Sequence, residues 1–260
     1  MKRYLTTTQL SATRAFDGGL LYMLGGHLLK LASLVILLLL WRSLAAQGAD
    51  LGGFTLEQLL AYTLLASILR EQLSVITPAT TAFWEGSIIS RYLRPLPVLG
   101  QMIAETVGGW LPGLALYTLP MICIAGLLGI NLLPILATNG PLFLCSLLLA
   151  VSLGFALDFL YASLVIYVKN ASYQAYTIRQ AITSLFSGAV IPFALLPWGL
   201  GRALEMLPFG SVASAPLLVL VGVSDPLRLI GLQLIWNLVF WPVTIWAFRG
   251  SEERMVSYGG

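Results

Sequence analysis

The run LLKLASLVILLLL at residues 28–40 decides the fold class of this chain. Its residues do not alternate between apolar and polar, whereas those of a strand in a membrane β-barrel do so over about 10 positions. Several other apolar stretches reach the roughly 20 residues that a helix needs to cross a hydrocarbon core. Of the 260 residues, 58% are hydrophobic and only 10% are charged, compared with about 25% charged in soluble domains. The sequence therefore predicts an all-α integral membrane protein.

We expect a single membrane domain over residues 1–260 with six transmembrane helices. The expected spans are residues 23–41, 55–76, 98–124, 141–168, 178–196 and 227–248. No cleavable signal peptide is apparent, because the polar N-terminal segment is long and no small-residue cleavage site follows a short apolar core. The spans are therefore expected to act as their own insertion signals.

Lysine and arginine indicate how these spans are oriented. With the N-terminus inside, the inner segments contain Lys2, Arg3, Arg14, Arg91, Arg94, Lys169, Arg179, Arg249 and Arg254. The outer segments then contain only Arg42, Arg202 and Arg228. Cytoplasmic loops are enriched in Lys and Arg, so both termini are predicted to be cytoplasmic.

Two segments outside the spans are expected to have structure of their own. Residues 4–22 are weakly amphipathic and predict an N-terminal interfacial helix, with a disordered tail as the alternative. The side chains expected to face lipid are Leu5, Ala12, Phe16 and Leu20. Residues 197–223 predict an outer re-entrant element between the fifth and sixth spans, because the apolar run 213–223 is too short to cross and prolines interrupt the segment.

The sequence offers little for catalysis. It contains no GxxxxGK[ST] phosphate loop, no HExxH and no GxSxG motif. A single histidine, His27, leaves little for general acid–base chemistry, and no His/Cys cluster suggests a metal site. Cys123 and Cys145 lie in apolar surroundings and read as free core residues, although a disulfide across a short outer loop is the alternative. We expect a protein that is not an enzyme.

Charged residues within spans are expensive and usually face the protein interior. Counting 1.5 Å per residue places Lys30 and Asp158 at similar depth, so we expect them to pair or to share a polar cavity. The same count predicts a pair between Arg70 and Glu105. Asp158 would then belong either to a substrate or proton path or to a packing pair.

Gly109 and Gly113 form a GxxxG pattern in the third expected span, next to Pro112. Small residues let helices approach closely, and the proline removes a backbone donor and kinks the helix. The pattern indicates helix packing or, more specifically, a dimer seam.

Residues 78–97 form a basic segment between two apolar runs, with FWEGSIISRYLRPLP at residues 83–97. Four apolar residues share one face at helical spacing: Ile88, Ile89, Tyr92 and Leu93. Arg91 and Arg94 lie on a polar side, and Pro95 stops the helix. The segment reads either as a surface helix anchored by its positive charges or as a docking helix for a cytoplasmic partner.

These features together resemble the permease subunits of type-2 ABC exporters (the ABC-2-type permease family). The resemblance is carried by GSIISRYLRP at residues 86–95 and by IPFALLPWGLGRALEMLPFGSVASAPLLVLVG at residues 191–222. A weaker match is the pair of glycines that follows Ser257 and Tyr258. The order and spacing of the motifs cover essentially the whole chain.

The resemblance implies a dimer of permeases, from the same or a sister chain, in the lipid bilayer of the cell inner or plasma membrane. Two separate ATPase subunits would bind ATP and Mg, while this chain itself would bind neither a cofactor nor nucleic acid. The coupling segment 78–97 would contact the ATPase through Trp84, Glu85, Arg91, Tyr92 and Arg94. A second inner contact would lie at residues 169–179, and the outer element would act as a gate.

Substrate would pass near the second and fifth spans. Candidate lining residues are Tyr62, Phe186 and Ser187, in a cavity compatible with lipids, amphiphiles, peptides or glycans. The alternative function is an ion-driven carrier or an energy-coupling substrate-binding membrane component. A carrier usually has inverted repeats and more polar residues within its spans, and neither is apparent here.

Overall fold

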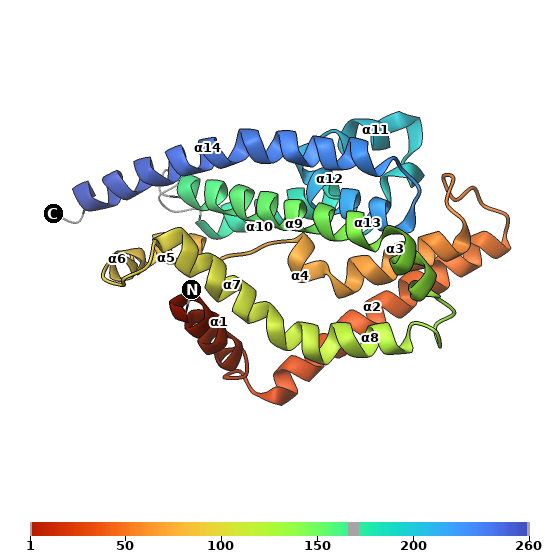
Figure 1. The fold of residues 1–260 in the computed structure, drawn as a ribbon, viewed down its shortest axis with the longest axis horizontal. Coiled ribbons are helices and arrows are strands. Elements are labelled where there is room, and N and C mark those ends of the chain that lie inside the picture. The colour runs from red at the N-terminus through yellow and green to blue at the C-terminus, as the bar shows by residue number, and fades with distance from the viewer. Residues whose placement is uncertain (1, 166–171, 259–260) are drawn as a thin grey trace.

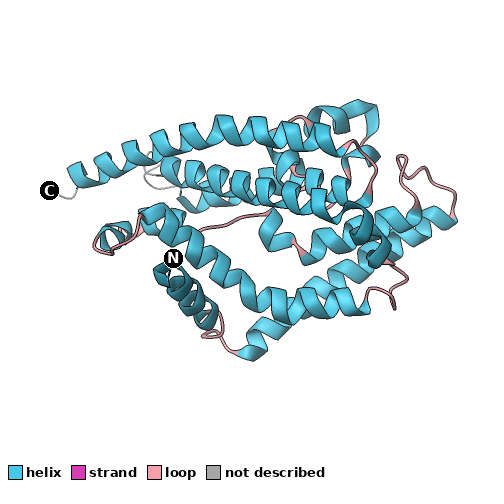
Figure 2. Ribbon diagram, in the orientation of Figure 1, coloured by secondary structure: helices cyan, strands magenta, loops and turns pink. Residues whose placement is uncertain are grey.

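A computed structural model describes residues 2–165 and 172–258, and every regular element in these ranges is a helix (Figures 1 and 2). The prediction of an all-α protein is confirmed. Lys169 and the terminal glycines 259–260, which the sequence analysis singled out, lie outside the described residues. The shorter elements that recur below are α1 (Lys2–Arg14), α3 (Leu56–Ile68), α4 (Arg70–Leu73), α5 (Ala79–Trp84), α6 (Ile88–Tyr92), α10 (Ser172–Phe186), α11 (Leu200–Glu205), α12 (Pro208–Val212) and α13 (Ser214–Val221).

Four apolar helical segments in the described residues are long enough to cross a membrane. They are α2 (Leu20–Ala46), the continuous run Val98–Ile124, α9 (Leu132–Val165) and α14 (Pro226–Tyr258). The run Val98–Ile124 consists of α7 (Val98–Gly113), the π-helical turn η1 (Leu114–Thr118) and α8 (Leu119–Ile124). These segments match four of the six expected spans.

The other two expected spans are not single long helices. For residues 55–76, α3 begins at a capping box, in which the Thr55 hydroxyl accepts from the Gln58 N–H and the Gln58 side chain accepts from the Thr55 N–H. It ends at Ile68, Leu69 is its C-cap, and the short helix α4 follows. For residues 178–196, α10 begins at Ser172, before the expected start, and ends at Phe186.

The helices α9 and α14 form the longest contact of the fold and run in parallel. Polar side chains join them along their length, at separations in sequence that stay between 87 and 89 residues. The joined pairs are Gln233 with Ser146, Asn237 with Leu149, Trp241 with Ser152, Thr244 with Ala156 and Ser251 with Ser163. A constant offset is possible only if both helices run in the same direction, and hydrogen bonds between helices are a recognised source of stability in membranes.

The N-terminal segment is helical, as the interfacial-helix prediction requires, but it ends at Arg14 and α2 already begins at Leu20. The helix α1 packs along α7, where Gly100 faces Tyr4 and Gly108 faces Thr8 and Ser11. The Ser11 hydroxyl donates to the Glu105 carbonyl at 2.7 Å. Gly109 of the GxxxG pattern faces no neighbour within 4 Å, so Gly108 is the glycine that permits this close packing.

The segment expected to be an outer re-entrant element consists of short helices, including α11, α12 and α13. Every residue of α13 is buried. Its last carbonyls are capped by side chains: Asn139 donates to Leu220 and Gln58 donates to Val221. Gly222 ends the helix with φ +72°, a conformation that favours glycine. This element lies at the opposite end of the molecule from α5 and α6 (Figure 1).

Candidate functional site

A buried ion pair connects the helical bundle to the segment that precedes α5. Asp158 on α9 is completely buried, and its carboxylate pairs with the guanidinium of Arg179 on α10, which is 7% exposed. Arg179 also donates to the Val75 carbonyl at 2.6 Å, and Asp158 accepts from the Thr77 N–H at 2.9 Å. The pair therefore holds two helices and the backbone of residues 75–77 together.

This arrangement corrects the expected pair between Asp158 and Lys30. Asp158 pairs with Arg179, and Lys30 instead pairs with Glu71 on α4 at 2.6 Å. Arg179 was placed in an inner loop by the sequence analysis, whereas it lies on α10 and points into the bundle. Glu71 was missed, although its position next to Arg70 within the expected span 55–76 was a usable signal.

The expected pair between Arg70 and Glu105 is also wrong. Glu105 on α7 binds Arg91 at 2.9 Å and Arg94 at 3.5 Å, both from the segment around α6. Gln101, one turn earlier on α7, donates to the carbonyls of Arg91 and Leu96. These contacts fix α6 against the start of α7.

Two irregular stretches of backbone meet beside the Lys30–Glu71 pair. The break after α3 leaves the Ile68 carbonyl without an intrahelical donor, and the Thr118 hydroxyl donates to it at 2.9 Å. Thr118 belongs to η1, which follows Pro112, and π-helical turns of this kind often occur at functional sites. From the same turn, the Tyr117 hydroxyl bonds Ser67 at 2.8 Å, and its ring lies under the Lys30 ammonium.

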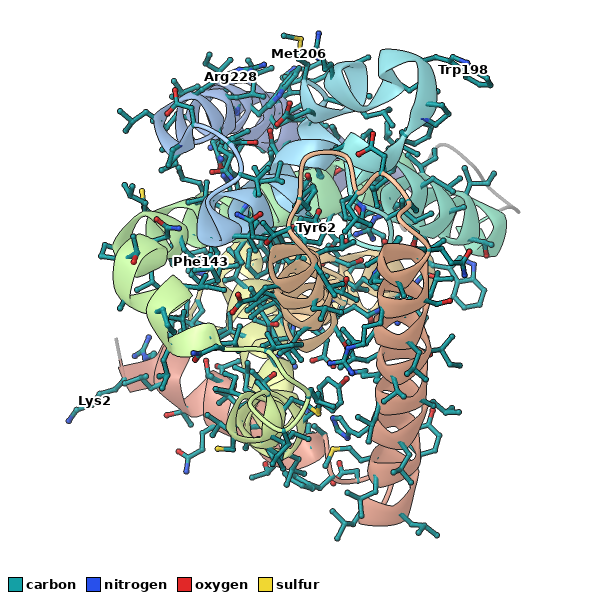
Figure 3. All side chains as sticks on the ribbon, turned by 90° about the vertical axis from the view of Figure 1, so that its right-hand side faces the viewer. Lys2, Tyr62, Phe143, Trp198, Met206 and Arg228 are labelled. Atoms are coloured by element: carbon teal, nitrogen blue, oxygen red, sulfur yellow. The ribbon has the colours of Figure 1, made fainter. Side chains whose placement is uncertain are left out.

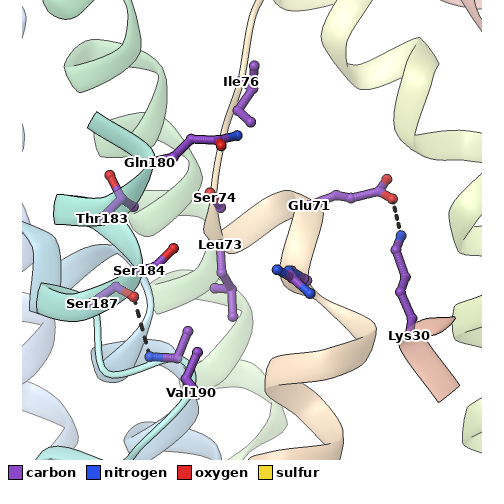
Figure 4. Close-up of a pocket in the computed structure, with 12 residues that line it drawn as sticks. Lys30, Glu71, Leu73, Ser74, Ile76, Gln180, Thr183, Ser184, Ser187 and Val190 are labelled. Carbon is purple, nitrogen blue, oxygen red and sulfur yellow. Dashed lines mark hydrogen bonds and ion pairs between the residues drawn. The ribbon is translucent and has the colours of Figure 1, made fainter. Parts of the chain in front are cut away.

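A cavity of about 310 Å³ opens next to this junction (Figure 4). Charged residues of α2 and α4 form part of its wall, and polar residues of α10 face them. Its lining consists of Lys30, Arg70, Glu71, Leu73, Ser74, Ile76, Gln180, Thr183, Ser184, Ser187, Ala189 and Val190. The chain that follows the break at Leu69 therefore forms one wall of this cavity.

The three candidate substrate-path residues have different surroundings. Ser187 lines the cavity, where its hydroxyl accepts from the Ala189 N–H. Tyr62 lies in the interior of the bundle (Figure 3), where its hydroxyl donates to the Gly188 carbonyl at 2.8 Å. Phe186 is partly exposed at the end of α10 and is not among the residues that line this cavity.

The segment around α5 and α6 presents apolar side chains to its surroundings. Trp84 is 65% exposed, Ile89 56% and Leu93 87%, whereas Ile88 is buried in the core. Arg91 is largely covered by its contact with Glu105, and Arg94 is more exposed. Apolar side chains therefore form much of the exposed surface of this segment, and Arg91 contributes little to it.

Within the described residues, no group of His, Cys, Asp and Glu side chains is arranged to hold a metal ion. Cys123 and Cys145 are free and exposed, which corrects the expectation that they are core residues.

Comparison with known protein families agrees with this architecture. The family described as ABC-2 family transporter protein matches residues 31–259, which is most of the chain. The chain belongs to the ABC-2 transporter family. No curated protein and no solved structure matched the chain.

Membership makes this chain an ABC-2-type permease, a multi-pass transmembrane component of an ABC transporter. The match begins in α2 and includes α5, α6 and the residues that line the cavity from α4 and α10. Permeases of this family generally work with ABC ATPase subunits, and a transport component is consistent with the expectation that the chain is not an enzyme.

Proposed function

We propose that this permease is the membrane-spanning subunit of an ATP-driven exporter. Two permeases, identical or sister chains, form the substrate path, and separate ATPase subunits bind ATP and Mg. The observation that carries the proposal is the segment around α5 and α6, which exposes Trp84, Ile89 and Leu93 while its other contacts fix it to the bundle. A helix that presents apolar residues from a fixed position suits a groove on a partner.

The attachments of this segment support a coupling role. One end is joined to α9 and α10 through Asp158 and Arg179, and the other end is joined to α7 through Glu105. A displacement of α5 and α6 by an ATPase would therefore act on α7, α9 and α10 at once. The expected partner contacts from Trp84, Glu85, Tyr92, Arg91 and Arg94 remain a proposal, with Leu93 added because of its exposure.

Six crossings, with both termini cytoplasmic, also remain part of the proposal. Since α9 and α14 run in parallel, the chain between them must return to the other end of the bundle. We assign this return to α10 and the residues after it, and a second broken crossing to α3 and α4. The short outer helices α11 to α13 then form a gate on the far side of a plasma or inner membrane.

Co-purification tests the proposal. The tagged permease, expressed with the ABC ATPase of its own host, should retain the ATPase in detergent, and the complex should hydrolyse ATP faster in the presence of its substrate. Retention of an ATPase by the wild-type chain and its loss in Leu93→Ser would support coupling through this surface. A permease that transports an ion-coupled substrate in the absence of any ATPase would refute it.

A further inference from the structure

The cavity between α2, α4 and α10 has an unbalanced charge. Of the described residues that line it, three are ionisable, and two of these, Lys30 and Glu71, neutralise one another at 2.6 Å. Arg70 forms no ion pair with any acidic side chain in residues 2–165 and 172–258 whose placement is described. The lining therefore has one positive charge in excess.

The position of this charge makes an anionic occupant favourable. Arg70 is exposed and has no acidic partner among the described residues, so its charge is available to an anion that enters the cavity, and the attraction between opposite charges favours such an occupant. The planar guanidinium of arginine matches carboxylate, sulfate and phosphate groups with two parallel hydrogen bonds.

The rest of the lining supplies further donors for oxygen atoms. Ser74, just after α4, and Thr183 and Ser184 on α10 carry hydroxyls and line the cavity from two sides (Figure 4). Leu73, Ile76 and Val190 line the same space with apolar surface. A volume of about 310 Å³ is at the small end of ligand pockets, so it accommodates a polar group rather than a whole lipid.

We propose that this cavity binds the oxyanion group of the transported substrate, a phosphate, sulfate or carboxylate, with Arg70 as its main contact. The inference rests on the proposed transport function and adds the chemical class of the substrate. The anion would belong either to an amphiphile from the bilayer or to a water-soluble compound.

Binding to the full-length permease alone tests this assignment. The chain is reconstituted in nanodiscs of zwitterionic phosphatidylcholine, and thermophoresis measures the affinity for dihexanoyl phosphatidic acid, dihexanoyl phosphatidylcholine and inorganic phosphate. Phosphatidic acid should bind at least tenfold more tightly than phosphatidylcholine. Affinity for inorganic phosphate equal to that for phosphatidic acid would assign the site to a free anion, and weaker phosphate binding would assign it to an amphiphile.

Variants of the lining identify the contact. Arg70→Gln should weaken phosphatidic acid binding at least tenfold, whereas Arg70→Lys, which keeps the charge, should weaken it less. Glu71→Gln removes the acid among the described lining residues and releases Lys30, so binding should become several-fold tighter. The matched control is Arg228→Gln, which removes an exposed arginine from the start of α14 and should change the affinity less than twofold.

Equal binding of phosphatidic acid by the wild type and Arg70→Gln, or weaker binding by Glu71→Gln, would overturn the assignment. Thermal unfolding of each variant shows whether it is folded, and the gain expected for Glu71→Gln cannot arise from misfolding. Since no ATPase is present, a failure here leaves ATPase retention unaffected. A chain that binds the anion but retains no ATPase would refute the proposed function alone.

Discussion

The carboxylate of Asp158 faces the guanidinium of Arg179, and each of these side chains also binds the backbone of residues 75–77. The pair thereby fixes the entry of the chain into α5 relative to α9 and α10. The hydrogen bonds that these two side chains form with the backbone matter as much to the structure as the attraction between their charges. They join the part of the molecule that carries the cavity to the part that we propose contacts the ATPase.

Asp158→Asn should destabilise the permease more than it alters substrate preference. Removing one partner of a buried ion pair leaves the other charge uncompensated and costs about 3–5 kcal/mol. Thermal unfolding in detergent, followed by the yield of monodisperse protein, measures the effect. The double variant Asp158→Asn/Arg179→Gln should be more stable than Asp158→Asn alone. Normal assembly of Asp158→Asn with an altered substrate profile would contradict this view.

The ion pair between Lys30 and Glu71 should contribute much less stability. Its side chains are 27% and 37% exposed, and exposed pairs contribute about 1 kcal/mol or less. Lys30→Met should therefore lower the unfolding midpoint only slightly, while anion binding should weaken because the cavity loses a positive charge. A loss of stability as large as that of Asp158→Asn would show that this pair is structural.

Gly108→Ala should separate α1 from α7. A Cβ at this position would meet the Thr8 carbonyl and approach the Ser11 Cβ at 2.7 Å, and overpacking of this kind costs about 1–3 kcal/mol. The control is Gly109→Ala, because this neighbouring glycine faces open space. Limited proteolysis at Arg14 should become faster in Gly108→Ala and remain unchanged in Gly109→Ala. Equal cleavage of both variants would contradict the packing seen here.

Leu93→Ser should weaken binding of the ATPase without unfolding the permease. Leu93 is 87% exposed, so its replacement removes little internal packing. Leu127→Ser is the control, because Leu127 is 88% exposed but lies after α8, at the other end of the molecule. Titration of the ATPase against reconstituted permease should show at least a fivefold loss of affinity for Leu93→Ser alone. Similar affinities for both variants would place the ATPase elsewhere.

Arg91→Glu should act differently, because Arg91 binds Glu105 rather than facing outward. The substitution brings two carboxylates together and should displace α6 from α7, which lowers both stability and ATPase binding. Arg91→Glu/Glu105→Arg should restore part of both properties. If the double variant remains as impaired as the single one, Arg91 contacts the partner directly.

The sequence was sufficient to predict the four long helices, because an uninterrupted apolar run leaves no other structure in lipid. It was not sufficient to predict the break at Leu69. Nothing in residues 56–76 requires the helix to end there, because the freed Ile68 carbonyl accepts a hydrogen bond from Thr118, which lies 50 residues further along the chain. Only the folded bundle reveals that bond.

The polar pairs were predicted incorrectly for the same reason. Counting depth along straight spans assumes that residues 55–76 and 178–196 are continuous helices. The break turns Glu71 toward Lys30, and the early start of α10 carries Arg179 into the interior beside Asp158. The polar residues of the candidate site were therefore visible in the sequence, but their partners were not.

Residues 74–78 connect α4 to α5 as an extended, non-helical stretch of chain (Figure 1). Five residues reach at most about 18 Å when fully extended. Ser74 and Ile76 of this connection line the cavity, and Arg179 and Asp158 bind its backbone at Val75 and Thr77. A partner that moves α5 would therefore displace part of the cavity wall through these five residues, with no further element in between.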